Sequence, residues 1–316
     1  MRVLVCGSNY GRTYITALAR EPRKYQLAGI LAQGSQRSLC LAALSGVPLF
    51  HSADELPDNI DLACGAMSSA AFPGVLQLLR RGIHVLCEHP YSASSLQKAF
   101  ALTRKRYLQF HVNGHFVNLP APQAFVRACR QADGLAAPEF VDVMVTERSL
   151  YGALDILLLA MGGRQPLRAR LLDRRNKFAL LQGTLGRIPL KISVQVSGKT
   201  SRDRLADGSP NYLLDMRLTA AFPHGMLTLL SMAGPVVWNA TATRAQKGEP
   251  LWAELGQRAT RTVAELGKER IAANLEALNA IRKSILKGVT PATQQPRHIL
   301  RVARAWELVG RQLYSD

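Results

Sequence analysis

The chain has 316 residues, 47% of them hydrophobic, and 40 Lys and Arg against 22 Asp and Glu give it a formal net charge of +18. This length allows one large or two medium domains with buried cores. No apolar run reaches the roughly 20 residues that a membrane-spanning helix needs, and the first residues lack the pattern of a secretory signal peptide. We therefore expect no membrane partner and a cytoplasmic location.

The positive charge favours polyanionic partners such as nucleic acid, phosphorylated cofactors or an acidic protein. Arginine is spread along the chain, however, and neither a recognition helix nor an RNA-binding motif accompanies it. We therefore expect no nucleic-acid partner. A solvated basic face is the simpler interpretation of the densest group, which comprises Arg164, Arg168, Arg170, Arg174, Arg175 and Lys177.

Five cysteines are scattered through apolar stretches without a Cys-x-x-Cys pair. An odd number of isolated thiols is typical of a reducing compartment, and it favours neither disulfides nor a metal centre. We expect all of these thiols to be buried and no metal to be bound. The five residues are Cys6, Cys40, Cys64, Cys87 and Cys129.

The first part of the chain alternates between short apolar runs and helical patterns. The apolar runs lie at 2–6, 26–32, 61–67, 84–87 and 108–112. The helical patterns between them lie at 10–20, 37–45, 72–81 and 95–106. Repeated strand–helix units predict an α/β fold of the Rossmann type, with a parallel sheet and a ligand crevice at the carboxyl ends of its strands.

After about residue 121 the rhythm changes, and strands follow one another with few helices. Helical patterns at 122–131 and 151–161 flank an alternating strand at 138–146. Later strands are expected at 167–172, 178–185, 188–196, 212–222, 226–231 and 235–241, with a polar loop over 197–211 and two amphipathic helices at the end. Adjacent strands without crossovers predict a large, mainly antiparallel sheet in an α+β domain.

We therefore expect two domains, a Rossmann NADP-binding domain over 1–118 and an α+β substrate and dimerisation domain over 119–316. The C-terminal helices are candidates for packing back on the first domain. Because the open sheet of the second domain would otherwise expose a large apolar face, we expect a homodimer.

The first strand runs into the sequence Gly7-Ser8-Asn9-Tyr10-Gly11-Arg12. Gly7 stands where a strand turns sharply into a helix, and Gly11 permits either close helix–sheet packing or close approach of a phosphate. The start of the helix offers free N–H groups and a partial positive charge to a pyrophosphate. A merely structural turn is the alternative, but a position inside a full β-α-β unit favours dinucleotide binding.

The second strand ends in Leu31-Ala32-Gln33-Gly34-Ser35-Gln36-Arg37-Ser38, which contains no acid. NAD-binding domains usually carry a carboxylate here for the ribose hydroxyls, and a carboxylate would repel a 2′-phosphate. Ser35, Arg37 and Ser38 can instead donate hydrogen bonds and charge to that phosphate. We expect the cofactor NADP(H) at this segment, including Gln33 and Gly34. A helix start capped by Ser35 is a compatible structural role.

The strand predicted beside the nicotinamide ends in Glu88-His89-Pro90. Together with the two expected domains, a Glu-x-Pro at this point resembles the glucose-fructose oxidoreductase and inositol dehydrogenase superfamily. Sugar-oxidising members carry a lysine between the Glu and the Pro, and a histidine four residues after an aspartate. This chain has His89 at the first position and, four residues after Asp155, Leu159. Both proton carriers of the sugar type are therefore absent.

Further blocks of the chain are similar to the thiazolinyl imine reductases of yersiniabactin- and pyochelin-type siderophore biosynthesis, a nonribosomal peptide pathway. These blocks lie at 30–35, 84–90, 150–162 and 234–238. The resemblance implies NADPH-dependent reduction of a thiazoline C=N to a thiazolidine. It also implies an intermediate held by a carrier protein on a phosphopantetheine arm, and this anionic partner would suit a basic chain.

Hydride addition to C=N requires a proton for the nitrogen, and a positioned acid contributes about 10²–10⁴-fold. His89 is the first candidate because histidine titrates near neutral pH. His115 and Tyr151 are further candidates, and each has a structural role as its alternative. Family members carry a tyrosine in the aromatic stretch after the next strand, where this chain has Phe116, so the resemblance leaves the proton donor open.

The remaining candidates position the cofactor or the substrate. Glu88 orients the turn or the ribose, and Pro90 shapes the backbone beside the nicotinamide. The candidate substrate residues are Asn113 at a strand end, Asp155 on a leucine-rich helix and Trp238, which could stack on an aryl ring. For each of them a turn cap or a core position is the alternative.

Two other functions stay open at this point. An NADP-dependent oxidoreductase of the same superfamily that acts on another small carbonyl or imine would share the cofactor site and differ in the substrate it turns over. A non-enzymatic nucleotide-sensing or polyanion-binding protein would bind NADPH or nucleic acid without turnover.

Overall fold

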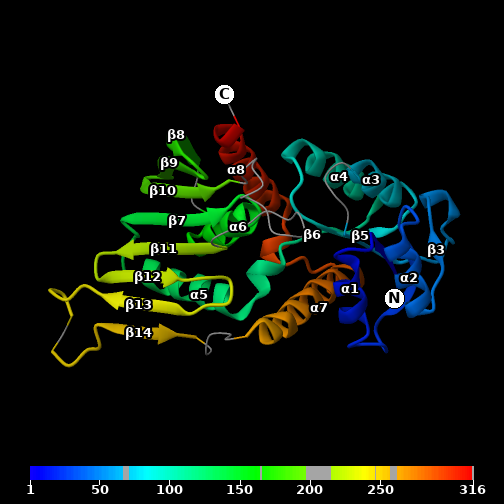
Figure 1. The fold of residues 1–316 in the computed structure, drawn as a ribbon, viewed down its shortest axis with the longest axis horizontal. Helices are drawn as coiled ribbons and strands as arrows, with labels where there is room; N and C mark the ends of the chain where they lie inside the picture. The colour runs from blue at the N-terminus through cyan, green and yellow to red at the C-terminus, as the bar shows by residue number, and fades with distance from the viewer. Residues whose placement is uncertain (67–70, 164–165, 197–214, 246, 257–261, 315–316) are drawn as a thin grey trace. The chain divides into compact units, whose positions relative to one another are not determined.

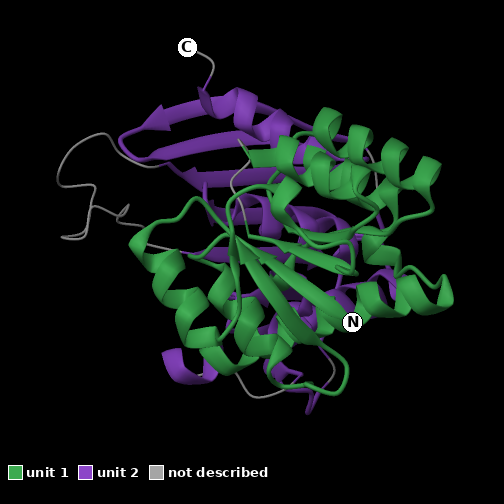
Figure 2. Cartoon of the chain, turned by 90° about the vertical axis from the view of Figure 1, so that its right-hand side faces the viewer, with its two compact units in different colours: residues 1–115, 267–303 green, residues 116–266, 304–316 purple. Residues whose placement is uncertain are grey.

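The computed structural model describes residues 1–66, 71–163, 166–196, 215–245, 247–256 and 262–314. The chain divides into two compact units, coloured green and purple in Figure 2. Unit 1 comprises Met1–His115 and Gly267–Ala303, and unit 2 comprises Phe116–Leu266 and Arg304–Asp316. The polar loop expected at 197–211 lies outside the described residues.

Unit 1 is built on a six-stranded sheet in the order β3-β2-β1-β4-β5-β6, of which β3, β5 and β6 are labelled in Figure 1. Its strands are β1 (Arg2–Cys6), β2 (Gln26–Leu31), β3 (Leu49–Phe50), β4 (Leu62–Gly65), β5 (His84–Glu88) and β6 (Phe110–Asn113). The connecting helices are α1 (Gly11–Leu18), α2 (Gln36–Ser45), α3 (Phe72–Arg80) and α4 (Ala93–Arg106). All neighbouring strands pair in parallel, which confirms the expected Rossmann sheet and brings the carboxyl ends of its strands to one edge.

The apolar core of unit 1 joins segments from both ends of the sequence. Buried side chains of β1, β4, β5 and α1 pack with those of α7 (Val263–Lys287). Full burial of one such leucine or isoleucine contributes about 1.5–3 kcal/mol. Helix α7 is thereby held on the Rossmann unit, by side chains that include Leu278 and Ile281.

Strand β6 lies at the edge of this sheet, and a side chain pairs with its free edge in place of another strand. The Gln294 carboxamide, in the short 3₁₀ helix Ala292–Gln294, accepts from the N–H of Val112 at 2.9 Å. Its Nε2 donates to the carbonyl oxygen of Val112 at 3.0 Å. One carboxamide therefore makes the pair of hydrogen bonds that a neighbouring strand would make.

Unit 2 contains an eight-stranded sheet in the order β14-β13-β12-β11-β7-β10-β9-β8. Its strands are β7 (Phe140–Thr146), β8 (Leu167–Arg175), β9 (Phe178–Leu185), β10 (Ile188–Gln195), β11 (Met216–Phe222), β12 (Gly225–Leu229), β13 (Val236–Ala240) and β14 (Trp252–Leu255). Only β7 and β10 pair in parallel among these described strands, so the expectation of a mainly antiparallel sheet is confirmed. The helices of this part are α5 (Pro120–Leu135), α6 (Leu150–Ala160) and the end of α8 (Pro296–Tyr314).

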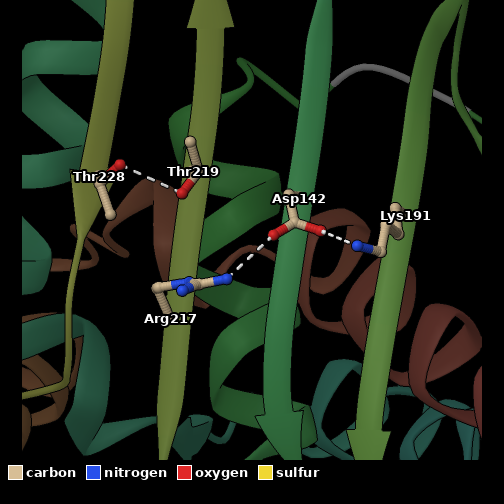
Figure 3. Close-up of polar contacts among 5 residues, drawn as sticks. All are labelled: Asp142, Lys191, Arg217, Thr219 and Thr228. Atoms are coloured by element: carbon tan, nitrogen blue, oxygen red, sulfur yellow. Dashed lines mark hydrogen bonds and ion pairs between the residues drawn. The ribbon is translucent and has the colours of Figure 1, made fainter. Parts of the chain in front are cut away.

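The two faces of this sheet differ. Helices α5 and α6 pack on one face, and every residue of α6 is buried. On the other face Asp142 lies between two cations, 3.6 Å from Nζ of Lys191 and 3.4 Å from a guanidinium nitrogen of Arg217 (Figure 3). A hydrogen bond of 3.1 Å joins the hydroxyls of Thr219 and Thr228 beside them. This face is therefore open and mixed in polarity.

The thiols differ from expectation at one position. Four of the five cysteines are buried, but Cys40 is exposed. It lies on α2, a helix that buries only Ser38 and Ala42. The expectation that all five thiols are inside is therefore wrong for Cys40, because an apolar neighbourhood in the sequence did not reveal which face of α2 carries it.

The described residues hold neither a membrane-crossing helix nor a metal-binding cluster. No helix among them is both long enough and apolar enough to span a bilayer. No three or more of their His, Cys, Asp and Glu side chains gather in a way that could hold a metal ion.

Candidate active site

The turn after β1 uses its two glycines in different ways. Gly7 has φ of +91°, and a Cβ there would stand 2.5 Å from the carbonyl oxygen of Ala66, just after β4. A Cβ on Gly11 would stand 2.8 Å from Cγ1 of Val5 in β1. Of the two roles open to Gly11, the structure therefore shows close helix–sheet packing. Tyr10 is the N-cap residue of α1.

A cavity of about 590 Å³ opens beside this turn, at the carboxyl ends of β1 and β2. Gly7 and Ser8 line it from the turn, Gln33 and Ser35 line it from the segment after β2, and His51 lines it from the segment after β3. The volume is typical of small-molecule sites. Its place in a strand-end crevice is where α/β sheets bind nucleotides. Asn9 and Arg12 are exposed in the same turn.

The serines at the start of α2 have different surroundings. Ser35 caps the helix, since its Oγ accepts from the N–H of Ser38 at 3.4 Å. Ser38 is fully buried, and its hydroxyl donates to the carbonyl oxygen of Ser35 at 2.7 Å. Arg37 is exposed between them. Gly34 precedes the cap, where a Cβ would stand 3.0 Å from the ring of His51. Ser38 thus holds the turn, while Ser35 and Arg37 stand at its surface.

Glu88 and Asn113 stand opposite each other at the carboxyl ends of β5 and β6. Nδ2 of Asn113 lies 2.9 Å from Oε1 of Glu88 and 2.8 Å from the hydroxyl oxygen of Tyr14. Tyr14, one turn into α1, donates its hydroxyl hydrogen to the same Oε1. The register of the two strands therefore brings the carboxyl and amide groups together, and α1 closes over them.

Burial raises the pKa of the Glu88 carboxyl from 4.5 to about 7. The cause is loss of hydration, which disfavours the charged form. The hydrogen bonds from Tyr14 and Asn113 act in the opposite direction and keep the pKa from rising further. Near neutral pH this carboxyl therefore exists in both protonation states.

The network continues from Asn113 to the far end of the chain. Nδ2 of Asn113 lies 2.6 Å from Oδ1 of Asn274 in α7. Nδ2 of Asn274 donates to the carbonyl oxygen of Arg270 at 3.0 Å and lies 3.3 Å from the hydroxyl of Tyr10. That hydroxyl is in turn 3.3 Å from Nδ1 of His115. Two predicted site residues, Tyr10 and His115, are thus joined to a third, Asn113.

Asn113 also carries a hydrogen-bond acceptor that has no partner among the described residues. Its side chain is 1% exposed, and Oδ1 is buried with no hydrogen-bond partner among the described residues. A buried polar atom of this kind costs free energy unless something pairs with it. Because it lies at the strand ends where this fold binds its ligands, it fits an N–H donor of a bound molecule, such as a carboxamide.

The backbone of Asn113 holds the side chain of His89. Its Nδ1 lies 2.9 Å from the carbonyl oxygen of Asn113. A carbonyl oxygen only accepts, so Nδ1 carries a hydrogen and Nε2 is the nitrogen that gains or loses a proton. The peptide bond from His89 to Pro90 is cis. His89 can therefore release a proton from Nε2 while its ring stays anchored through Nδ1.

His115 has a different environment, although its ring centroid lies 6.2 Å from that of His89. Burial, together with the charges of His89 and Arg270, lowers the pKa of His115 from 6.5 to about 3. His115 is therefore neutral at neutral pH, and the two histidines differ in what they can do chemically.

The other candidates belong to unit 2. Tyr151 and Asp155 are buried on α6, and the Tyr151 ring packs edge-on against Trp306 of α8, with centroids 6.5 Å apart. Trp238, in β13, lines a cavity of about 480 Å³ that also contains His224. Tyr151 is thus buried beside a second aromatic ring, and the roles of these three residues in substrate binding or catalysis stay predictions.

Phe116, which stands where family members carry a tyrosine, has a packing role. A Cβ on Gly152 of α6 would stand 2.6 Å from its ring. A side chain at position 152 would therefore collide with the ring, and glycine leaves the space that the ring occupies.

Sequence reasoning missed three residues of the site, namely Tyr14, Asn274 and His51. Tyr14 stands four residues after Tyr10, and this spacing places both tyrosines on one face of α1. Asn274 is fully buried, and it interrupts the apolar stripe of α7, a polar residue where the helical period predicts an apolar one. His51 follows a two-residue strand and had no comparable signal.

Two families match successive parts of the chain. Residues 1–114 match the family described as "Oxidoreductase family, NAD-binding Rossmann fold", and residues 136–239 match "Thiazolinyl imine reductase Irp3-like, C-terminal". Residues 1–114 therefore carry a domain of the NAD-binding Rossmann oxidoreductases, the superfamily that the Glu88-His89-Pro90 block indicates. Residues 136–239 carry the Irp3-like C-terminal domain, and the two matches together confirm the resemblance seen in the sequence. No curated protein sequence matches the chain significantly.

Solved structures show the same fold over almost the whole chain. UDP-N-acetylglucosamine 3-dehydrogenase GnnA from Acidithiobacillus ferrooxidans is 16% identical, with a TM-score of 0.71 over 99% of this chain and 97% of that one. GenD2 from gentamicin A biosynthesis, solved in complex with NAD, is 16% identical, with a TM-score of 0.70 over 99% of this chain and 93% of that one. An oxidoreductase from Agrobacterium radiobacter is 12% identical, with a TM-score of 0.73 over 99% and 96%. At these identities the likeness establishes the fold alone.

Glu88→Gln is expected to flatten the dependence of stability on pH. The folded pKa of about 7 is higher than the 4.5 of an exposed carboxyl, so the folded state binds this proton more tightly than the unfolded chain does. Its contribution to the free energy of unfolding is therefore full below about pH 4.5 and is lost as the pH rises through about 7. Urea unfolding between about pH 5 and about pH 8 measures the slope.

The matched control is Glu139→Gln, which removes an exposed carboxyl of unit 2 and is expected to keep the wild-type slope. Identical slopes for the wild type and Glu88→Gln would show that the buried carboxyl does not titrate in this range.

Proposed function

We propose that this chain is an NADPH-dependent thiazolinyl imine reductase acting on a carrier-protein-bound siderophore intermediate. The observation that carries the proposal is the match of residues 136–239 to the Irp3-like C-terminal family. It is joined to a Rossmann unit in which His89 stands at the strand ends. In the reaction, a hydride adds to the carbon and a proton to the nitrogen of a thiazoline C=N, which gives the C–H and N–H of a thiazolidine.

The residues of unit 1 fit a dinucleotide. The glycine turn and the start of α1 hold the pyrophosphate through backbone N–H groups. The cavity lined by Gln33, Ser35 and His51 receives the adenosine end, and the buried Oδ1 of Asn113 accepts from the carboxamide. NADPH supplies the hydride when it is bound. A 2′-phosphate is supported by the absence of an acid after β2 and by the exposed Arg37 at the start of α2.

His89 supplies the proton in this proposal. Its Nδ1–H stays bound to the carbonyl oxygen of Asn113, so the ring keeps its orientation while the Nε2 proton moves to the thiazoline nitrogen. His89 then takes a new proton from solvent before the next turnover. Glu88 positions Asn113, and through that residue's backbone it positions His89.

His89→Gln is expected to lower kcat about 100-fold, because a positioned acid contributes about 10²–10⁴-fold. The glutamine amide can keep a hydrogen bond to the Asn113 carbonyl but cannot release a proton at Nε2. The measurement is the decay of NADPH absorbance with a hydroxyphenyl-thiazoline, offered both free and on a carrier protein. The control is His51→Gln, which alters the cavity at β3 and leaves His89 in place; it is expected to change KM for NADPH more than kcat.

Two outcomes would count against this assignment. A small effect of His89→Gln would move the acid role to another group, such as His115, Tyr151 or water. Absence of turnover with either form of the substrate, despite NADPH binding, would favour the alternative: an NADP-dependent oxidoreductase of the same superfamily that acts on a different carbonyl or imine.

Arg37→Ala is expected to weaken NADPH binding about tenfold or more, since one charge-assisted hydrogen bond contributes about 1.5–3 kcal/mol. Binding of NADH, which lacks the 2′-phosphate, is expected to stay near the wild-type level. Fluorescence titration with both nucleotides measures the ratio. Arg20→Ala is the matched control, because Arg20 is exposed beyond the C-terminal end of α1. Equal losses for NADPH and NADH would contradict selection for the phosphate.

We also propose a homodimer formed through the open face of the eight-stranded sheet. Phe140, Leu172, Met226 and Trp252 contribute large apolar side chains that are 38% to 66% exposed, and exposed apolar patches of this kind mark interfaces. Sedimentation equilibrium is expected to give about twice the 34.6 kDa chain mass. Met226→Asp is expected to shift the mass toward the monomer, whereas Leu44→Asp, at an exposed position on α2, is not. A monomer mass for the wild type would contradict this proposal.

The carrier protein and the cellular setting belong to the same proposal. An acidic carrier with an anionic arm is attracted by a chain of net charge +18, and the arginines of the edge strand β8 give that charge a local concentration. A cytoplasmic location fits NADPH-dependent chemistry and five cysteines that are all free thiols.

A further inference from the structure

Tyr10 is the one side chain of the glycine turn that reaches into the polar network. Its ring packs edge-on against Tyr14, with centroids 6.0 Å apart, and lies 5.7 Å from the ring of His115. Its hydroxyl stands 3.3 Å from both Nδ1 of His115 and Nδ2 of Asn274. Three segments far apart in the sequence thus meet at one hydroxyl group.

The hydrogen bonds of this network have a fixed direction. Oε1 of Glu88 accepts from the Tyr14 hydroxyl, and it is an acceptor both when the carboxyl is ionised and when the proton is on Oε2. The side of Asn113 that faces it is therefore the Nδ2 donor. The same Nδ2 lies 2.6 Å from Asn274, which must therefore present Oδ1 as the acceptor.

With its Oδ1 so placed, Asn274 presents Nδ2 on the other side. There it donates to the carbonyl oxygen of Arg270 and to the Tyr10 hydroxyl. Turning the Asn274 amide around would place two donors against each other at Asn113 and two acceptors against each other at Arg270. The direction of the whole chain of bonds therefore follows from the carboxylate.

The Tyr10 hydroxyl, which accepts from Asn274, keeps its own hydrogen for His115. Burial raises the pKa of Tyr10, and the charge of Glu88 raises it further, so the phenol is protonated and donates to Nδ1 of His115. An imidazole nitrogen that accepts a hydrogen bond carries no hydrogen, and in a neutral ring the hydrogen is then on Nε2.

We propose that Tyr10 and Asn274 are positioning residues that fix His115 as a neutral imidazole with its hydrogen on Nε2. His89 is the opposite case, since its Nδ1 carries the hydrogen. The two neighbouring rings thus have separate roles: His89 exchanges the proton, and His115 is a permanent donor at Nε2 that does not change its protonation state. The assignment of the tautomers does not depend on the proposed function, and only its effect on turnover does.

The test is ¹⁵N NMR of the full-length protein labelled at its seven histidines, in which two-bond ¹H–¹⁵N couplings distinguish the two neutral tautomers. His115→Gln and His89→Gln assign the two rings. We expect the Nε2–H pattern for His115, and for His89 the Nδ1–H or the doubly protonated pattern. An Nδ1–H pattern for His115 in the wild type would overturn the proposal.

Two variants test the cause of the tautomer. Tyr10→Phe removes the donor, and the His115 signals are expected to move toward the average of the two tautomers. Asn274→Asp replaces the Nδ2 donor by an acceptor, so the Tyr10 hydroxyl turns to the new carboxylate and His115 is expected to show hydrogen on Nδ1. If neither variant changes the His115 pattern, Tyr10 and Asn274 do not set it.

Tyr25→Phe is the matched control. It removes a phenol hydroxyl that donates to Oδ1 of Asn279 at 2.9 Å on the same helix α7, and it is expected to leave the His115 signals and kcat unchanged. Tyr10→Phe is expected to lower kcat about tenfold, the order that one net hydrogen bond supports, with KM for NADPH near the wild-type value. Because the NMR experiment needs no turnover, failure of imine reduction and failure of the tautomer assignment are separately visible.

Discussion

The carboxyl group of Glu88, enclosed by Tyr14 and Asn113, is the constraint on which the rest of the site depends. Because this carboxyl accepts hydrogen bonds and is buried away from water, it determines which way the Asn113 amide faces. Asn113 then acts in two directions, through its side chain toward α7 and through its backbone carbonyl toward His89. The pairing of β5 with β6 therefore positions both the side chain and the backbone carbonyl of Asn113.

The fold supplies this arrangement by topology and not by proximity in the sequence. A parallel sheet brings the carboxyl ends of its strands to one edge, so residues 88 and 113 become neighbours through register. Helix α7 then returns from the last part of the chain to the same unit, and its packing in the apolar core places Asn274 where the strand ends need a polar partner. The site of unit 1 is thus completed by a segment that follows all of unit 2's strands.

Patterns that act over short distances were readable from the sequence, and partners across long distances were not. Alternating strands and helices, the glycine turn, the missing acid after β2 and the Glu-His-Pro block each depend on a few adjacent residues, and they led to the Rossmann sheet and to the correct branch of the superfamily. Asn274 could not be paired with Asn113 in this way, because 160 intervening residues carry no periodic signal for one amide meeting another. The same limit applied to Gly11, whose role depends on how closely α1 lies on Val5, and to Cys40, whose exposure depends on the rotation of a helix with few buried residues.

The carboxamide of Gln294 affects whether another chain can pair with the edge strand β6. An unpaired outer strand is a template onto which other chains can add, and proteins that leave one open risk joining edge to edge. In unit 1 the middle of β6 is already saturated by a side chain that copies the spacing of a backbone amide. β6 therefore has a covered edge beside the strand end that carries Asn113, and this covering hinders the addition of a foreign strand there.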